Sequence, residues 1–370
     1  MIKLLAVDDS ALMRKLLGQV FSSEPDFEVR LARNGLEALE LAKSFRPDVI
    51  TLDVHMPQMD GLECLDRLMI ERPCPVVMLS SLTAEGADAT LEAFRLGAVD
   101  FVAKPAGAVS LRMDEFVPEL LTKVRSAANV KLSTSLRLRE RVRHRIGGVP
   151  RSARLRPPRL HAHRTAPADF PGGEALVLVG TSTGGPPALE DLLSGMPADF
   201  PWPIVVAQHI PASFTGPLAK RLDKLCAISV VEVTEPVSLQ PGYAYIGRGD
   251  DDIVITRTPN LAAMPAPPEP DYLWHPSVDR LVRTAMAHMQ PARLIGVLMT
   301  GMGDDGAKAM CSLREQGGRT IAESEATAVV WGMPGELVRL NGADFVVPLS
   351  KISQRLQRLV DADAPDPQDG

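Results

Sequence analysis

The sequence lacks several features that would place it in a special class of protein. No apolar run is long enough to cross a bilayer, so we expect no membrane-spanning helix. The opening residues, MIKLLAVDDS, do not resemble a signal peptide, because the carboxylates of Asp8 and Asp9 interrupt the apolar run at once. The four cysteines lie far apart, without the spacing of a metal site or a redox pair. We therefore expect a cytoplasmic globular protein whose cysteines are reduced.

Acidic residues are almost missing from one stretch, although the whole chain has a formal charge of −6. Residues 126–165 contain eleven Lys and Arg and one acidic residue, Glu140, so this stretch carries +10 and the rest of the chain −16. It is rich in Gly and Pro and predicts a flexible basic linker over residues 126–172. A basic run can bind nucleic acid or anionic lipid, but this one has no aromatic residues for base stacking. We therefore favour a tether and expect no nucleic-acid partner.

Before this linker, apolar runs alternate with segments of helical spacing. Such alternation indicates a parallel sheet with helices on both faces, and we expect a first domain at residues 1–125. The expected strands are Leu4–Val7, Val29–Ala32, Val49–Leu52, Val76–Leu79 and Phe101–Val102.

Polar residues follow these strands where function gathers in parallel sheets, at the carboxyl ends. Asp8 and Asp9 close the first strand, and Asp53 closes the third. Three neighbouring carboxylates repel one another unless a cation joins them, and such oxygen ligands suit Mg²⁺. Ser80 and Lys104, at the ends of the fourth and fifth strands, suit a phosphoryl group.

In these motifs the first domain resembles the receiver domain of two-component response regulators. The resemblance implies that Asp53 in "TLDVHMPQMDG" is the phosphoacceptor, that Asp8, Asp9 and Asp53 bind Mg²⁺, and that Ser80, Phe101 and Lys104 form the switch. At the position of His55 the family uses a backbone carbonyl toward the metal, so we expect the His55 side chain to face solvent.

A second alternating pattern begins after the linker and predicts another domain at residues 173–360, followed by an acidic tail at 361–370. The fold class expected for the whole chain is therefore α/β, with two doubly wound parallel-sheet domains, one flavodoxin-like and one Rossmann-like. The strand-like runs are Leu176–Val179, Ile204–Ala207, Ile253–Ile255, Leu294–Met299 and Phe345–Val347, and the helix-like runs are Ser277–Met289 and Ala307–Gln316.

Three polar positions end apolar runs in this domain: Ser182, His209 and the pair Asp304-Asp305. On one sheet edge they would make a nucleophile, a general base and an orienting carboxylate. Gly180 to Gly184 matches G-x-S-x-G, but the order Ser, His, Asp is not that of α/β-hydrolases. A phosphate-binding turn is the weaker alternative, because "GTSTGG" lacks the Walker lysine.

Together, "GTSTGG", "VVAQHIPASF", "PSVD", "LMTGMGDDGAKAM" and "AESEATAVVWGMP" resemble the catalytic domain of chemotaxis protein-glutamate methylesterases. The resemblance implies Ser182 as nucleophile, His209 as base and Asp305 as orienting residue, with Asp304 as the alternative. It also implies an oxyanion hole from the backbone N–H groups of Thr183 and Met302. One departure is Trp274, which stands where the family often has histidine.

The activity implied by this resemblance is hydrolysis of glutamate methyl esters on methyl-accepting chemoreceptors, with release of methanol, and deamidation of receptor glutamines. The implied partners are those receptors, met only peripherally at the membrane, and a chemotaxis histidine kinase that phosphorylates Asp53. Hydrolysis itself needs no cofactor, and Mg²⁺ serves the receiver alone. The sequence leaves two other classes open: a response regulator whose second domain only binds, and a nucleic-acid regulator that uses the basic linker.

Overall fold

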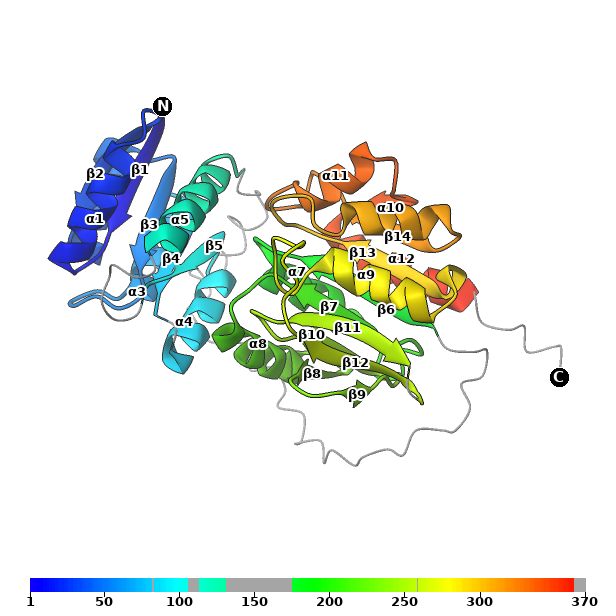
Figure 1. The fold of residues 1–370 in the computed structure, drawn as a ribbon. Helices are drawn as coiled ribbons and strands as arrows, with labels where there is room; N and C mark the ends of the chain where they lie inside the picture. The colour runs from blue at the N-terminus through cyan, green and yellow to red at the C-terminus, as the bar shows by residue number, and fades with distance from the viewer. Residues whose placement is uncertain (82, 106–112, 131–174, 258, 363–370) are drawn as a thin grey trace, which may run out of the picture. The chain divides into compact units, whose positions relative to one another are not determined.

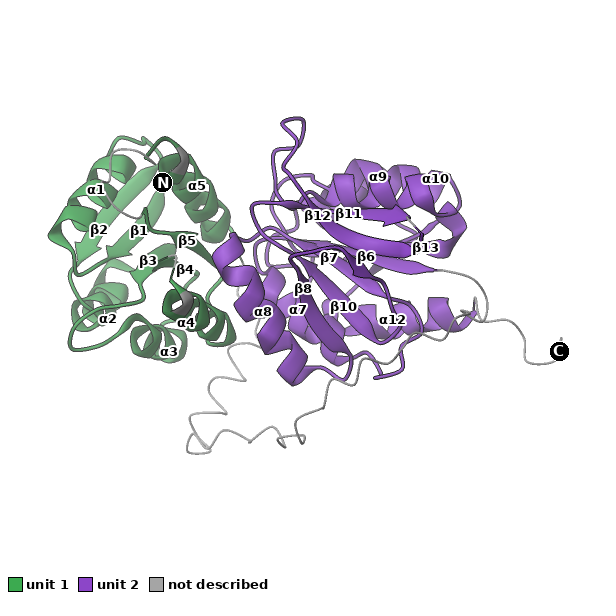
Figure 2. Cartoon of the chain, turned by 60° about the horizontal axis from the view of Figure 1, so that its bottom comes forward, with its two compact units in different colours: residues 1–149 green, residues 150–370 purple. Residues whose placement is uncertain are grey.

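The computed structural model describes residues 1–81, 83–105, 113–130, 175–257 and 259–362 (Figure 1). The chain divides into two compact units, Met1–Val149 and Pro150–Gly370 (Figure 2). Most of the predicted basic linker and nearly all of the predicted acidic tail lie outside the described residues, so both stay predictions. No helix in the described part of the chain is both long enough and apolar enough to cross a membrane.

The first unit is a five-stranded parallel sheet in the order β2-β1-β3-β4-β5. Helices α1 and α5 cover one face, and α2, α3 and α4 cover the other (Figure 2). The elements are β1 (Ile2–Val7), α1 (Ala11–Ser22), β2 (Phe27–Ala32), α2 (Gly35–Phe45), β3 (Val49–Asp53), α3 (Gly61–Glu71), β4 (Val76–Ser80), α4 (Ala84–Arg95), β5 (Asp100–Ala103) and α5 (Met113–Ala128).

All five strands predicted for this unit are present. β3 and β4 are apolar runs buried along their whole length, whereas β2 is an edge strand that exposes Arg30 and Leu31. Helix starts follow capping chemistry: the side chains of Ser10, Asn34, Asp60 and Thr83 each accept a backbone N–H of the first turn. Helix α5 continues past residue 125 to Ala128, since Val124 and Ala127 extend its buried face.

The second unit contains a seven-stranded parallel sheet in the order β15-β14-β13-β6-β7-β10-β8. Its elements are β6 (Leu176–Thr181), α7 (Gly185–Ser194), β7 (Ile204–Gln208), α8 (Ala212–Leu225), β8 (Ser229–Val233), β10 (Tyr243–Gly247), α9 (Val278–His288), the 3₁₀ turn η1 (Pro291–Arg293), β13 (Leu294–Leu298), α10 (Ala307–Glu315), β14 (Arg319–Glu323), α11 (Met333–Arg339), β15 (Phe345–Val347) and α12 (Leu349–Ala362).

A separate antiparallel sheet, in the order β11-β12-β9, belongs to the same unit. Its strands are β9 (Val237–Ser238), β11 (Asp252–Arg257) and β12 (Leu261–Ala266). The expected strand Ile253–Ile255 is thus present as part of β11, but it lies outside the parallel sheet that the pattern predicted. The reason is the short connection from β11 to β12, which permits only antiparallel pairing. Ile253 and Ile255 pack into the same hydrophobic core as α9.

The expected α/β class is confirmed for both units, with this antiparallel sheet as an addition. Helices α9 and α10 begin and end within one residue of their predicted bounds. The Ser277 hydroxyl caps the N-terminus of α9, which fixes its start.

Candidate functional site

The acidic residues of the first unit gather at the carboxyl edge of its sheet. Oxygen atoms of Asp8, Asp9 and Asp53 lie within 4.8 Å of one another. Lys104 Nζ lies 2.8 Å from Asp8 Oδ2 and 2.8 Å from Asp53 Oδ2, so one ammonium group bridges two carboxylates. The structure therefore brings together the four charged residues that the sequence analysis assigned to this site.

The electrostatics of this cluster favour an added cation. Burial raises the pKa of the Asp53 carboxyl, the charge of Asp8 raises it further, and the hydrogen bond from Lys104 only partly opposes them. Asp9 is exposed, which leaves one side of the cluster open to water. Carboxylate and water oxygens are the ligands that Mg²⁺ prefers, so the donor set fits this ion.

The structure also places the other three residues noted in the first unit, Ser80, Phe101 and His55. The Ser80 hydroxyl donates to the carbonyl of Gly86, 3.0 Å away in α4, and so points toward that helix. Phe101 is buried, with its ring edge-to-face against Phe94. His55 is exposed, as expected, and only its backbone N–H contacts the Asp53 carboxylate.

In the second unit, three neighbouring strands lead into the residues that the motifs singled out. In the order β13-β6-β7, β6 leads into Ser182, β7 into His209 and β13 into the loop with Asp305. The sheet grows from β6 in both directions, because β7 is added on one side and β13 on the other. Ligand sites of open parallel sheets lie at such a switch point.

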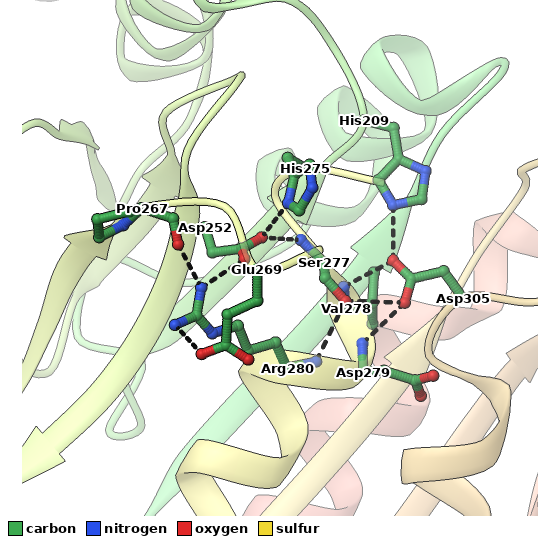
Figure 3. Close-up of polar contacts among 10 residues, drawn as sticks. All are labelled: His209, Asp252, Pro267, Glu269, His275, Ser277, Val278, Asp279, Arg280 and Asp305. Atoms are coloured by element: carbon green, nitrogen blue, oxygen red, sulfur yellow. Dashed lines mark hydrogen bonds and ion pairs between the residues drawn. The ribbon is translucent and has the colours of Figure 1, made fainter. Parts of the chain in front are cut away.

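His209 and Asp305 are in direct contact (Figure 3). His209 Nε2 lies 2.8 Å from Asp305 Oδ2, and both side chains are buried. An ionised carboxylate can only accept a hydrogen bond, which assigns the proton to Nε2 and a lone pair to Nδ1. His209 Nδ1 is buried and has no hydrogen-bond partner among the described residues. The ring thus presents one basic nitrogen that is shielded from bulk water.

Asp305 lies at the N-terminus of α9. Its carboxylate accepts the backbone N–H groups of Val278 (2.8 Å) and Asp279 (3.0 Å) and the Ser277 hydroxyl (3.1 Å). Burial alone would raise the pKa of the Asp305 carboxyl, but the bonds from His209, Asp279 and Val278 outweigh it and hold the pKa below its ordinary value. The helix dipole also favours negative charge here. Asp305 therefore stays ionised and can stabilise a protonated imidazole.

The neighbouring Asp304 is placed differently. Its side chain is 57% exposed, and its nearest charged partner is Lys308, with 3.7 Å between Nζ and Oδ2. Of the two aspartates that the sequence left open, Asp305 is the one in contact with His209.

Hydrogen bonds to both neighbouring strand ends fix the turn that carries Ser182. The Ser182 N–H donates to the carbonyl of Thr300 (3.0 Å), and the Thr300 hydroxyl donates to the carbonyl of Thr183 (2.9 Å). The side-chain amide of Gln208 donates to the carbonyls of Ser182 (3.1 Å) and His209 (3.0 Å). Gln208 thus joins the serine turn to the histidine loop.

Two glycines make this arrangement possible. Gly184 has a φ of 75°, a left-handed conformation that glycine adopts without steric cost. A Cβ on Gly301 would lie 2.9 Å from Ser182 Cβ, so the backbone just before Met302 lies against the serine. Ser182 itself does not have a positive φ, and the turn therefore differs from the strained nucleophile elbow of α/β-hydrolases.

Behind the site, a buried carboxylate holds the "PSVD" segment in place (Figure 3). Asp252 accepts hydrogen bonds from the Ser277 N–H (2.7 Å), from Arg280 Nη1 (2.6 Å) and from His275 Nδ1 (3.0 Å). The Asp279 carboxylate accepts the N–H of Ala309 in the first turn of α10. These bonds fix the N-terminus of α9, and with it the donors to Asp305.

The sequence analysis missed Glu323, which closes β14 and is fully buried. Glu323 Oε2 accepts the N–H of Thr300 at 2.9 Å, so this carboxyl holds the loop that holds Ser182. Burial raises its pKa to about 7. The sequence did contain a signal for Glu323: a carboxylate at the end of an apolar strand is the pattern by which Asp53 was predicted.

Trp274, noted in the sequence only as a departure, stacks on His209. The two ring centroids are 5.4 Å apart and the ring planes differ by 11°. No sequence pattern predicts this contact, because Trp274 lies in the segment between β12 and α9, far from His209 along the chain.

Comparison with known proteins identifies both units. Residues 177–356 match the family model of the CheB methylesterase, and residues 4–113 match that of the response regulator receiver domain. A protein-glutamate methylesterase/protein-glutamine glutaminase of Rhodopseudomonas palustris is 55% identical over 99% of this chain and all of its own length. The chain belongs to the CheB methylesterase family. The resemblance drawn from the motifs is thereby confirmed.

A second curated relative covers nearly the whole chain, and a solved structure covers half of it. A protein-glutamate methylesterase/protein-glutamine glutaminase of Rhodospirillum rubrum is 50% identical over 96% of this chain and 95% of its own length. The crystal structure of the CheB methylesterase catalytic domain of Thermotoga maritima is 34% identical, with a TM-score of 0.49, and covers 50% of this chain and 99% of its own.

Proposed function

We propose that this chain hydrolyses the methyl esters of glutamate side chains in chemoreceptors and deamidates receptor glutamines, with Ser182, His209 and Asp305 as its catalytic residues. The observation that carries this proposal is the 2.8 Å contact between His209 and Asp305 beside the turn that holds Ser182. The names of the relatives, methylesterase and glutaminase, support the two substrates.

Acylation begins when His209 Nδ1 accepts the proton of the Ser182 hydroxyl, and Oγ attacks the ester carbonyl. Asp305 keeps the imidazole in the Nε2–H tautomer and stabilises the charge that the ring gains. The backbone N–H groups of Thr183 and Met302 donate to the oxyanion, and each such donor contributes roughly 3 kcal/mol to the stability of the transition state. Methanol then leaves with the proton from Nδ1.

Deacylation uses the same residues in the reverse order. His209 removes a proton from water, the hydroxide attacks the acyl-serine, and the glutamate carboxylate is released while Ser182 regains its proton. With a glutamine substrate the leaving group is ammonia instead of methanol. The amide is the poorer substrate, because its nitrogen must be protonated before it leaves.

The receiver regulates this hydrolysis through phosphorylation of Asp53. Asp8, Asp9 and Asp53 would hold the Mg²⁺ that this transfer needs, and Lys104 would contact the phosphoryl oxygens. A bound Mg²⁺ neutralises the negative charge of the acidic cluster and of the phosphoryl group. Ser80 and Phe101 would respond to the phosphoryl group, and this switch in the receiver would raise the rate of hydrolysis.

The partners proposed are methyl-accepting chemoreceptors, reached at their cytoplasmic helices, and a chemotaxis histidine kinase that phosphorylates Asp53. The kinase is supported by the receiver domain, and the receptors by the names of the relatives, protein-glutamate methylesterase and protein-glutamine glutaminase, together with the motif resemblance. The chain would then work in the cytoplasm and contact the membrane only through its receptors.

The test uses purified full-length protein and receptor-containing membranes that carry radiolabelled methyl esters. The proposal predicts release of labelled methanol, and conversion of receptor glutamine to glutamate detected by peptide mass spectrometry. Membranes that lose neither methyl groups nor amides, with or without acetyl phosphate and Mg²⁺, would contradict it and favour a receiver with a binding domain.

A further inference from the structure

Trp274 covers one face of the His209 imidazole. The two rings are nearly parallel, at 11°, and their centroids are 5.4 Å apart, within the range of offset stacking between aromatic rings. The His209 side chain is only 6% exposed. The edge of the imidazole contacts Asp305 through Nε2, whereas the indole contacts the face of the imidazole. The two contacts are therefore roughly perpendicular.

Two contacts fix the position of Trp274. The next residue, His275, is tied to the buried carboxylate of Asp252 by a 3.0 Å contact. A Cβ on Gly303 would lie 3.6 Å from Trp274 Nε1, so the indole also packs against the loop that carries Asp305. Leu273, just before it, is 88% exposed, so Trp274 is the residue where this segment turns inward.

We propose that Trp274 is a positioning residue for the reaction: its indole holds the His209 imidazole in the plane of the Asp305 carboxylate and stabilises the protonated ring. This inference rests on the function proposed above, in which His209 gains a proton during acylation. The face of an indole carries negative electrostatic potential and attracts a cation placed over it. The contact therefore strengthens when the imidazole becomes charged, which is the condition for lowering an activation barrier.

Other charged groups near the His209 imidazole also influence the stability of its protonated form. The charged or titratable side chains on the neighbouring loops and on the first turn of α9 include Arg248, Asp250, Asp251, Asp252, His275, Asp279, Arg280, Asp304 and Asp305. Among the described residues, Asp305 is the one of these that hydrogen-bonds the imidazole. Substituting Trp274 changes none of these charges.

Two substitutions separate the aromatic face from simple shielding. Trp274→Phe keeps an aromatic face, whereas Trp274→Leu keeps an apolar cover without one. In the full-length protein we expect Trp274→Leu to lower kcat roughly tenfold, with KM within about twofold, and Trp274→Phe to lower kcat less than about threefold. The acidic limb of the pH–rate profile should move to lower pH by about half a unit in the Leu variant, because the protonated ring has lost a stabilising contact. Leu273→Ala, next in the chain, serves as the matched control and should change neither quantity.

Tryptophan fluorescence gives a second readout that does not depend on activity. A protonated imidazole quenches an indole stacked on it, so the difference in emission between wild type and Trp274→Phe should fall as the pH drops through the titration of His209. His209→Gln should remove this step, measured as the same difference with and without Trp274→Phe, in which emission from Trp202 and Trp331 cancels. Equal kcat and equal pH midpoints in the Leu and Phe variants, or a fluorescence step that survives His209→Gln, would overturn the inference. If Ser182→Ala kept its hydrolysis, the proposed function would fail instead, and the fluorescence titration would still decide whether the stack senses His209.

Discussion

Asp53 in the first unit and Asp305 in the second are both buried carboxylates at the carboxyl edge of a parallel sheet, at 4% and 8% exposure. Their environments act in opposite directions. Burial and the nearby Asp8 charge raise the pKa of Asp53, with Lys104 as a partial counterweight. At Asp305, burial is outweighed by the hydrogen bond and charge of His209 and by the backbone N–H groups of Asp279 and Val278, and the pKa falls.

The difference shows how one sheet geometry supports two kinds of chemistry. Asp53 lies beside the Asp8 carboxylate, so added positive charge stabilises its anion. This environment suits a divalent cation, whose charge would also offset that of a phosphoryl group. The Asp305 carboxylate lies at a helix N-terminus and against a histidine, so it remains an anion, which suits the proposed support of proton transfer at the ring. Fold position alone does not assign a role; the donors around each carboxylate do.

The largest expected effect comes from removing the proposed nucleophile, which would break the assignment of covalent chemistry to the second unit. Ser182→Ala should lower methanol release by roughly 10⁴-fold or more, because no other group can form the acyl intermediate. Ser194→Ala, an exposed serine at the end of α7, is the matched control and should retain activity. Near-normal rates in Ser182→Ala, with an unchanged melting temperature, would refute the assignment.

A somewhat smaller effect is expected at the orienting carboxylate. Asp305→Asn should lower kcat by roughly 10³- to 10⁴-fold, because the amide no longer favours the Nε2–H tautomer or stabilises the charged ring. Asp304→Asn should stay within about twofold, since that side chain faces solvent and Lys308. Steady-state rates on the same methylated receptor decide between them, and a severe loss in Asp304→Asn alone would reverse the choice.

The corresponding Asp-to-Asn substitution in the first unit tests whether Asp53 has a different role from Asp305. Asp53→Asn should abolish phosphorylation by acetyl phosphate in the presence of Mg²⁺, together with the rise in hydrolysis that phosphorylation brings. The matched control is Asp88→Asn on the exposed face of α4. Intact-mass measurement after acetyl phosphate treatment reads out the result, and a phosphoryl group that persists on Asp53→Asn would point to another acceptor.

The smallest effect concerns stability at Glu323, a third buried carboxyl at a strand end. Its pKa rises from 4.5 in the unfolded chain to about 7 in the fold, so the native state keeps a proton that the unfolded state loses between these pH values. Stability should therefore decline from about pH 4.5 to about pH 7 and stay level above, with a total loss on the order of 3 kcal/mol.

Glu323→Gln should remove this decline, because the amide oxygen still accepts the Thr300 N–H but carries no charge. Urea unfolding at pH 5 and pH 8 measures the change for both proteins. Relative to wild type, the free energy of unfolding of Glu323→Gln should be higher at pH 8 than at pH 5. Parallel pH profiles for the two proteins would show that Glu323 does not titrate in this range.

Much of the fold was predictable because burial on both faces of a parallel sheet requires continuous apolar strands. That requirement marked β1, β3, β6 and β13, and the polar residue after each apolar run marked the sites. It failed for short or partly exposed strands such as β8 (Ser229–Val233) and β9 (Val237–Ser238), where no continuous apolar run exists. The prediction that β11 belongs to the parallel sheet was also wrong, because a strand-like run does not indicate which sheet the strand joins.

The sequence by itself determined the residue types and the strand ends that carry them, and hence that Ser182, His209 and an aspartate share one edge. The tertiary structure decided which aspartate contacts the histidine, because only the turn into α10 places Asp305 at the N-terminus of α9 and leaves Asp304 in solvent. It also decided that Trp274 covers His209 and that Glu323 lies beneath the serine turn. Such contacts join segments far apart in the chain, and local patterns carry no information about which distant segments meet.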